Sequence, residues 1–301
     1  MLLSKYNLPL AELAAMADKI RRENTGNALE TCTILNAKSG RCSEDCKFCA
    51  QSVHYQTDAP VYGLMSKREI VQSALIARDA GSSRFSIVTS GRRLGADDVA
   101  RVAEAAAEIR RRADIGVCVS LGSLNSDMMS LLKDAGVSRY HHNIETSREF
   151  FPAVVGSHTF DERIATIKRA VDAGLSICSG GIIGMGESRA DRVSMALTLK
   201  ELHVDSVPIN ILMPIEGTSL AGMAPISVGE VLKTIAIFRI ALPDKTIRLA
   251  AGRESHLKDF QGMAFMSGLN AIMIGGYLTK RGRPVEEDKQ LVEEVRRAWT
   301  E

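Results

Sequence analysis

The feature that most constrains the fold of this chain is a regular alternation of short β-rich runs with longer amphipathic runs. Eight strands alternating with helices over about 250 residues are typical of a (β/α)8 barrel of the TIM type. An open, doubly wound α/β sheet is the alternative, because periodicity alone does not distinguish the two folds. The predicted strands are Thr31–Ala37, Arg84–Thr89, Gly116–Leu121, Arg139–Glu145, Leu175–Ile182, Ser206–Leu212, Thr246–Ala250 and Ala271–Ile274.

The predicted helices carry clear start and stop signals. Capping boxes are expected at Ser66-x-x-Glu69, Thr159-x-x-Glu162 and Ser227-x-x-Glu230. A glycine follows three of the helical runs, at positions 81, 136 and 174, where a helix ends before the next strand. We expect an N-terminal helix at about 8–24, a C-terminal helix at about 285–299, and a single barrel domain over residues 1–301.

Charge and composition exclude several classes of protein. The net charge of +2 gives no reason to expect nucleic acid or an anionic membrane as a partner. The first twenty residues place apolar residues at helical spacing between charged ones, which predicts a surface helix and neither a signal peptide nor a membrane span. We therefore expect a cytoplasmic protein, in which six cysteines indicate metal ligation or catalysis in preference to disulfides.

Three of the cysteines lie together in the loop after the first predicted strand. Cys42, Cys46 and Cys49 have the spacing C-x3-C-x2-C, and their thiolates can bind three corners of a [4Fe–4S] cluster. The loop has no fourth cysteine, so one iron stays open to chelate the amino and carboxylate groups of S-adenosylmethionine (SAM). The spacing predicts a radical SAM enzyme whose cluster lies at the carboxyl ends of the strands, where ligands bind in both candidate folds.

A structural zinc site and unrelated buried thiols are the alternatives for these cysteines. Zinc sites usually combine two C-x2-C halves, and the sequence has no second half. Buried thiols would not crowd a polar loop that contains Glu44, Asp45 and Lys47. Both observations favour the iron–sulfur cluster.

Several longer segments resemble the biotin synthase family of radical SAM enzymes, in order, from about residue 10 to about residue 295. The matching segments are Asn36–Ser52, Tyr140–Thr146, Cys178–Glu187, Ser206–Asn210 and Ile247–Glu254. The resemblance implies a TIM barrel, usually a homodimer, that inserts sulfur into dethiobiotin to form biotin. A radical made from SAM abstracts hydrogen from the substrate, and an auxiliary iron–sulfur cluster donates the sulfur. The cofactors carry this chemistry, so no side chain is expected to be catalytic itself.

The same resemblance implies roles for residues around SAM and the substrate. Three side chains would hold SAM, and a backbone ledge would support it: Asn143, Glu145, Arg163, and Gly180, Gly181 and Ile182. Asn210 would bind the ureido ring of dethiobiotin, because an amide can donate and accept hydrogen bonds, and Asn143 would share this task. His141 is a further substrate candidate. Each residue also has a structural alternative, such as a helix cap, a tight turn or a satisfied buried amide.

The auxiliary cluster is where the sequence departs from the family pattern. Familiar members hold a [2Fe–2S] cluster with three cysteines and one arginine, and Cys118, Cys178 and Arg248 match three of these positions. Ser86 stands at the fourth, and a hydroxyl is a much poorer ligand for iron than a thiolate. Two further polar residues are expected beside the cluster, Arg84 and Ser206.

The remaining cysteine offers a replacement thiolate. Cys32 lies on the first predicted strand, next to the strand that carries Ser86, and alternation along the strand allows it to face inward. We expect Cys32 to join Cys118 and Cys178 around an auxiliary cluster of [2Fe–2S] or atypical type. The alternative is a small buried hydrophobic residue.

Three other functions remain open on sequence grounds. A related radical SAM barrel enzyme of maturase or mutase type would lack the second cluster, and Ser86 is the best argument for it. Lipoyl synthase is disfavoured because its extra N-terminal cysteine cluster is missing. A non-catalytic iron–sulfur protein would not need the SAM residues. As an enzyme of the family, the chain would also need an electron donor such as flavodoxin or ferredoxin.

Overall fold

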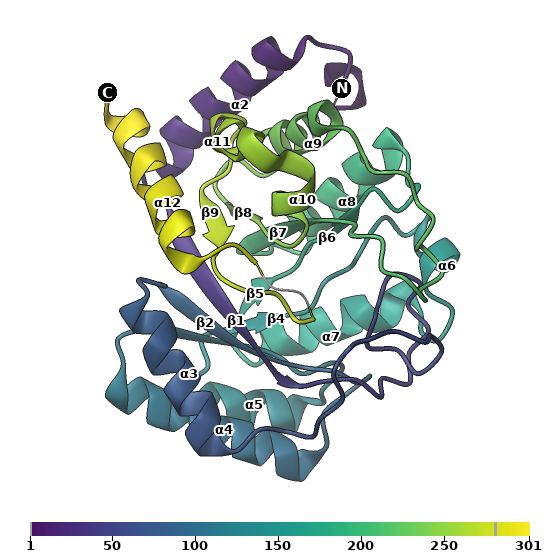
Figure 1. Ribbon diagram of the computed structural model, residues 1–301, viewed down its shortest axis with the longest axis vertical. Helices are drawn as coiled ribbons and strands as arrows, with labels where there is room; N and C mark the ends of the chain where they lie inside the picture. The colour runs from purple at the N-terminus through teal and green to yellow at the C-terminus, as the bar shows by residue number, and fades with distance from the viewer. Residues whose placement is uncertain (1, 280–281) are drawn as a thin grey trace.

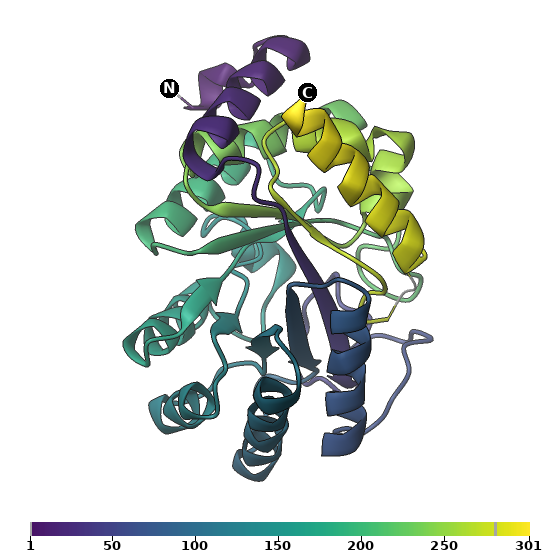
Figure 2. The same cartoon turned by 90° about the vertical axis from the view of Figure 1, so that its left-hand side faces the viewer.

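The computed structural model describes residues 2–279 and 282–301, and its strands form one closed parallel sheet. The sheet order is β5-β4-β3-β2-β1-β9-β8-β7-β6, and a further pairing of β5 with β7 closes the ring (Figures 1 and 2). Because β5 and β6 are two pieces of the fifth strand, the fold is the predicted eight-stranded TIM-type barrel. The strands are β1 Glu30–Lys38, β2 Arg84–Thr89, β3 Gly116–Ser120, β4 Arg139–His141, β5 Ser176–Cys178, β6 Gly181–Ile183, β7 Ser206–Ile211, β8 Thr246–Leu249 and β9 Ala271–Met273.

Helices cover the outside of the sheet, as Figure 2 shows for the blue and teal part of the chain. The helix α2 packs on α9 and α11, and α12 lies at the outer edge near them (Figure 1). The helices are α1 Leu2–Lys5, α2 Leu10–Thr25, α3 Lys67–Asp79, α4 Ala96–Arg112, α5 Ser126–Asp134, α6 Phe151–Val154, α7 Phe160–Asp172, α8 Arg189–Glu201, α9 Val228–Ala241, α10 Arg253–Leu257, α11 Gln261–Met266 and α12 Val285–Thr300, with a 3₁₀ turn at Lys258–Phe260. None of the helices in these ranges is long and apolar enough to cross a membrane.

Most of the predicted helix boundaries are confirmed. Reciprocal capping boxes start α3 at Ser66 and α7 at Thr159. The third predicted capping box is only half formed. The Ser227 side chain caps α9 by accepting from the Glu230 backbone N–H. The Glu230 carboxylate pairs with Arg189 and Arg192 and does not accept from the Ser227 backbone N–H. The glycines at positions 81, 136 and 174 have φ of 84°, 89° and 74°, the left-handed conformation of a helix end.

The fourth and fifth strands differ from the prediction because their backbones leave the sheet early. The fourth ends at His141, and Glu145 then adopts a left-handed φ of 69°, which is unusual for a residue other than glycine. The fifth is interrupted at residues 179–180, opposite Pro208 of β7. A proline has no backbone N–H to donate across the sheet, so the ladder cannot run unbroken past it. Both interruptions occur beside the cavity described below.

The helices bury apolar faces against the outside of the barrel. In α4, for example, Val99, Val102, Ala106 and Ile109 are fully buried at helical spacing, and the strand residues opposite them are equally buried. Outward-facing strand residues thus form the apolar core, which leaves the inward-facing positions free to carry polar side chains and thiols.

Candidate active site

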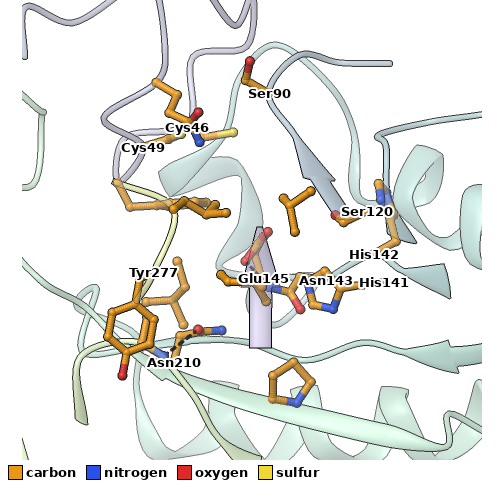
Figure 3. A pocket seen from close by; sticks show the side chains of 18 of the residues that line it. Cys46, Cys49, Ser90, Ser120, His141, His142, Asn143, Glu145, Asn210 and Tyr277 are labelled. Atoms are coloured by element: carbon orange, nitrogen blue, oxygen red, sulfur yellow. Dashed lines mark hydrogen bonds between the residues drawn. The ribbon is translucent and has the colours of Figure 1, made fainter. Parts of the chain in front are cut away.

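A cavity of about 410 Å³ opens at the carboxyl ends of the strands. It brings together the loop after β1 and inward-facing residues of the strands, including all six cysteines of the chain. In Figure 3, Cys46 and Cys49 lie at the upper left, Asn210 and Tyr277 at the lower left, and Glu145 and Asn143 nearer the centre of the view. The predicted residues that line it are Cys32, Cys42, Cys46, Cys49, Ser86, Cys118, His141, Asn143, Glu145, Arg163, Cys178, Ile182, Asn210 and Arg248.

The cysteine loop is held in shape by its own backbone and by one buried amide. Cys42 pairs with the Gln51–Val53 segment through backbone hydrogen bonds of 3.0 and 2.8 Å, which folds the loop back on itself. The side-chain amide oxygen of Gln51, Oε1, accepts from Ser39 Oγ and from the Gly40 N–H, at 3.0 and 3.2 Å. Burial raises the pKa of Cys49 to about 11 and that of Cys46 further. These thiols therefore need a nearby positive charge or metal to become thiolates.

Two acidic residues of the loop fasten it to the segment before α7. The Asp45 carboxylate accepts from the backbone N–H groups of Gly156 and Ser157 at 2.9 and 2.8 Å. Glu44 is buried and contacts His158 Nδ1 at 2.6 Å. Sequence reasoning noted both carboxylates only as signs of a polar loop, because their partners lie more than a hundred residues away.

Asn143, Glu145 and Arg163 form one connected polar group at the cavity wall. Asn143 Nδ2 donates to Glu145 Oε2 at 3.3 Å, and Arg163 Nη1 donates to the Asn143 carbonyl at 2.8 Å. Arg163 Nη2 lies 3.6 Å from Glu145 Oε1, while Arg163 Nε is buried without a partner in the described chain. A carboxylate and an unsatisfied guanidinium N–H suit a ligand that carries both hydroxyl and carboxylate groups.

The two glycines of the predicted ledge are explained by close backbone packing. A Cβ on Gly180 would lie 2.0 Å from the Pro208 carbonyl oxygen, and one on Gly181 would lie 2.2 Å from that of Glu145. The cavity itself is lined by Ile182. The glycines therefore let three chain segments approach one another, and this brings Glu145 and Ile182 to the same wall.

Asn210 bridges two strand ends and faces the cavity. Its Nδ2 donates to the Gly181 carbonyl at 3.1 Å, and its Oδ1 accepts from the Ala251 N–H at 3.2 Å. One amide hydrogen and one lone pair remain for a ligand. Tyr277 lines the same cavity, and its hydroxyl donates to Glu254 at 2.6 Å (Figure 3). Nothing in the local sequence indicated Tyr277, which reaches the cavity only through the turn after β9.

A second set of thiols lies deeper, on inward-facing strand positions. Cys32, Cys118 and Cys178 have exposed fractions of 3–4% and line the cavity, as does Ser86, the strand neighbour of Cys118. Burial raises the pKa of Cys32 to about 12; the neighbouring charge of Arg248 opposes this rise, and the other two thiols add to it. Cys32 therefore lines the cavity together with the other two thiols, as alternation along β1 allows.

Arginines and one histidine surround these deeper thiols. Arg248 Nη1 lies 3.7 Å from Cys178 Sγ, and Arg84 Nη1 lies 3.9 Å from Cys118 Sγ. Burial alone would raise the pKa of Cys178, but His141, with Arg248 and Arg139, lowers it to about 6. Cys178 therefore favours the thiolate at neutral pH, the form that binds metal. The Ser206 hydroxyl is buried nearby, on the strand position paired with Cys178, and has no partner in the described chain.

The thiols are spread out instead of converging on one point. Among the described residues, no three His, Cys, Asp or Glu side chains are arranged to hold a single metal ion. A cluster takes its ligands at separate irons, so a dispersed set of soft thiolates suits an iron–sulfur cluster better than a lone zinc. The donor chemistry of both cysteine sets fits such a group.

Two family models match consecutive parts of this chain, and solved structures share its fold. Residues 37–199 match the radical SAM superfamily model, and residues 208–295 match the Biotin and Thiamin Synthesis associated domain. Among solved structures, methylornithine synthase superposes with a TM-score of 0.84 at 18% identity, covering 97% of this chain and 91% of that one. The FeFe-hydrogenase maturase HydG from Carboxydothermus hydrogenoformans gives 0.78 at 20% identity, covering 97% and 77%. At these identities the structures establish the barrel fold alone.

The relatives found by sequence have a much higher identity to this chain than these structures do. The chain is 50% identical to the biotin synthase of Pelotomaculum thermopropionicum, over 95% of this chain and 89% of that protein. It is 49% identical to the biotin synthase of Aquifex aeolicus, over 94% and 86%. Fold, cysteine loop and superfamily match together define a radical SAM enzyme, which uses a [4Fe–4S] cluster and SAM. Within that class, the chain belongs to the biotin synthase family.

Proposed function

We propose that this chain is a biotin synthase, which inserts sulfur into dethiobiotin with SAM as the source of the radical. One observation carries the proposal: the loop cysteines, the polar group around Glu145 and a second set of buried thiols all line one cavity. Radical generation and sulfur donation could therefore act on the same bound substrate. The identity of about half the residues with biotin synthases, over nearly the whole chain, supports the same conclusion.

The loop cysteines and the polar group would make up the SAM half of the site. Cys42, Cys46 and Cys49 would hold the [4Fe–4S] cluster, which together with SAM supplies a 5′-deoxyadenosyl radical when bound. Glu145 and Asn143 would accept from the ribose hydroxyls, and the free Nε of Arg163 would face the methionyl carboxylate. The Gly180–Gly181–Ile182 backbone would hold the rest of the molecule against the wall.

The deeper thiols would make up the sulfur-donating half. We assign Cys32, Cys118, Cys178 and Arg248 to the auxiliary cluster, with Ser86 facing it as a non-ligating hydroxyl. Arg248 Nε is buried and has no partner in the described chain, so this atom is free to face the cluster. Three thiolates including Cys32 favour a cluster other than the familiar [2Fe–2S] type, because the third thiolate has moved from the Ser86 position to another strand.

Substrate would lie between the two halves. Asn210 has one amide hydrogen and one lone pair left over, which matches the N–H and C=O of a ureido ring. Asn143 is a second candidate for this ring. His141 contacts Cys178, so we assign it to the auxiliary site instead of the substrate.

Three further features belong to the proposal. Radical generation consumes one electron for each SAM, so the chain needs a low-potential donor of flavodoxin or ferredoxin type. By family resemblance we propose a homodimer in the cytoplasm, in which each chain acts as one barrel domain. Gel filtration with light scattering would test the dimer.

The decisive experiment is an anaerobic assay of the reconstituted protein with SAM, a reductant and dethiobiotin. Mass spectrometry should detect both biotin and 5′-deoxyadenosine, at about two nucleosides per biotin because two C–H bonds are broken. Replacing Cys42, Cys46 or Cys49 by Ala should abolish both products while the barrel stays folded. Lys47→Ala, an exposed position in the same loop, is the matched control and should keep both.

The assay separates the alternatives. 5′-Deoxyadenosine without biotin would favour a radical SAM enzyme of maturase or mutase type. A protein that forms neither product, although it carries clusters, would be a non-catalytic iron–sulfur protein.

A further inference from the structure

A carboxylate at the start of β1 joins three arginines beside the deeper thiols. Glu30 accepts from Arg84 Nε at 2.5 Å and from Arg139 Nη1 at 3.0 Å, and it also binds Arg248 Nη2. The side chains of Glu30 and Arg84 are 21% and 22% exposed, whereas those of Arg139 and Arg248 are only 8% and 4% exposed. Charges so shielded from water interact strongly with whatever else lies in the barrel.

Two of the three arginines direct their other edge at a cysteine. Arg84 uses Nε on Glu30 and brings Nη1 to 3.9 Å from Cys118 Sγ. Arg248 uses Nη2 on Glu30 and brings Nη1 to 3.7 Å from Cys178 Sγ. A guanidinium is planar and rigid, so a carboxylate bound at one edge fixes where the opposite edge points. Glu30 thus helps to fix the contacts of both arginines with the thiols, and Ser138 Oγ, which accepts from Arg84 Nη1 at 3.3 Å, is a further anchor for Arg84.

We propose that Glu30 is a positioning residue for the auxiliary cluster: it aims Arg84 and Arg248 at the cluster and limits the positive charge around it. This inference rests on the proposed function, because it takes Cys118 and Cys178 as cluster ligands. Three guanidinium groups against one carboxylate leave a surplus of two positive charges. The thiolates and sulfides of a cluster would balance that surplus.

The charge arithmetic gives the direction of the expected effect. Removing the negative charge of the Glu30 carboxylate makes the net charge around the cluster more positive by one unit. Reduction makes a cluster more negative, so added positive charge favours the reduced state and raises the reduction potential. Arg248 would also lose its fixed orientation, which should alter the electronic environment of the iron beside it.

The test compares reconstituted wild type with Glu30→Gln, which keeps the size of the side chain and removes its charge. The measurements are the Mössbauer spectrum, the reduction potential of each cluster and the melting temperature. Asp18→Asn is the matched control, because Asp18 pairs with the buried Arg21 on α2, outside the cavity. Glu30→Asp, which keeps the charge on a shorter side chain, serves as the conservative variant and remains informative should Glu30→Gln fail to fold.

We expect Glu30→Gln to raise the potential of the auxiliary cluster and change its Mössbauer signal, with the SAM cluster unaltered. Glu30→Asp should hold the potential near the wild-type value but still change the signal, since its carboxylate cannot reach all three arginines. Asp18→Asn should lower only the melting temperature. If the folded Glu30 variants have an auxiliary cluster with the wild-type reduction potential and Mössbauer spectrum, the role proposed for Glu30 is wrong, but the proposed function still stands. Wild-type protein with no second cluster overturns the proposed function and this inference with it.

Discussion

Among single residues, Cys32 and Ser86 line the same cavity from the adjacent strands β1 and β2. Cys32 is almost fully buried and lies near Cys118, Cys178 and Arg248. Thiolate is the competent ligand for iron, and a hydroxyl at either position is not. In the auxiliary site proposed above, position 32 would therefore supply the third thiolate.

Cys32→Ser tests this dependence. The substitution should remove or convert the auxiliary cluster and stop biotin formation, because the third thiolate is lost. SAM cleavage should continue, since the loop cysteines are untouched. Iron content and Mössbauer spectra measure the first effect, and 5′-deoxyadenosine measures the second. If iron content and the Mössbauer signal of the auxiliary cluster were unchanged, Cys32 would be a buried packing residue and not a ligand.

Asn210→Ala should weaken binding of dethiobiotin much more than binding of SAM. A lost hydrogen bond that strands a buried polar partner costs about 1–3 kcal/mol, which is about a 5- to 150-fold rise in Kd. The side chain also bridges Gly181 and Ala251, so the melting temperature should fall slightly. Calorimetric titration with each ligand checks the prediction, and equal losses for both would mean that Asn210 only stabilises the barrel.

Sequence reasoning could place residues in the cavity where their spacing in the chain was itself the signal. The three-cysteine loop is local, so Cys42, Cys46 and Cys49 could be recognised from spacing alone. Glu30 and Tyr277 could not, because their partners come from distant strands and turns. A weak signal for Glu30 did exist: it stands two residues before Cys32 and therefore on the same face of the strand.

Among the secondary-structure elements, the interrupted fifth strand contributes Cys178 and Ile182 to the cavity wall. Gly180 and Gly181 pack directly against carbonyl oxygens of Pro208 and Glu145. The alternating pattern predicted one continuous strand here, since periodicity reports burial and cannot reveal where a ladder loses a donor. Pro208 in the middle of β7 was the available sign.

Gly180→Ala and Gly181→Ala should each lower the free energy of unfolding. The added methyl group has no room, and overpacking of this kind costs about 1–3 kcal/mol or more. Gly229→Ala in α9 is the control, because nothing lies within 4 Å of its Cβ position; it should stabilise by about 0.5–1 kcal/mol. Urea denaturation of the three variants measures the differences. Wild-type stability in the first two would contradict the packing explanation.

At the scale of the whole molecule, a buried ion pair ties the C-terminal helix to the mouth of the barrel. Arg253 of α10 and Asp288 of α12 lie 2.7 Å apart with both side chains fully buried. Asp288 also accepts from the Gly275 N–H at 3.0 Å, just before the turn that carries Tyr277 to the cavity. The C-terminal helix is thereby coupled to the wall of the candidate active site.

Asp288→Asn should destabilise the protein by about 3 kcal/mol, because it leaves the buried Arg253 without its main counter-ion. Glu294→Gln on the same helix breaks an exposed pair with Arg297 and should change stability by less than about 0.5 kcal/mol. Thermal unfolding compares the two. Equal effects would show that the buried pair contributes no more than a surface pair.

In the proposed enzyme, one cavity joins SAM cleavage to sulfur donation by a second cluster. The most direct test is a single turnover of protein reconstituted with isotopically heavy sulfide, in buffer that contains only ordinary sulfur compounds. Mass spectrometry should then find the heavy isotope in biotin, with no more than about one biotin per chain, because a cluster that gives up a sulfide would have to be rebuilt before a second turnover. Biotin made entirely with the light isotope, or SAM cleavage with no biotin at all, would show that the second cluster does not donate the sulfur.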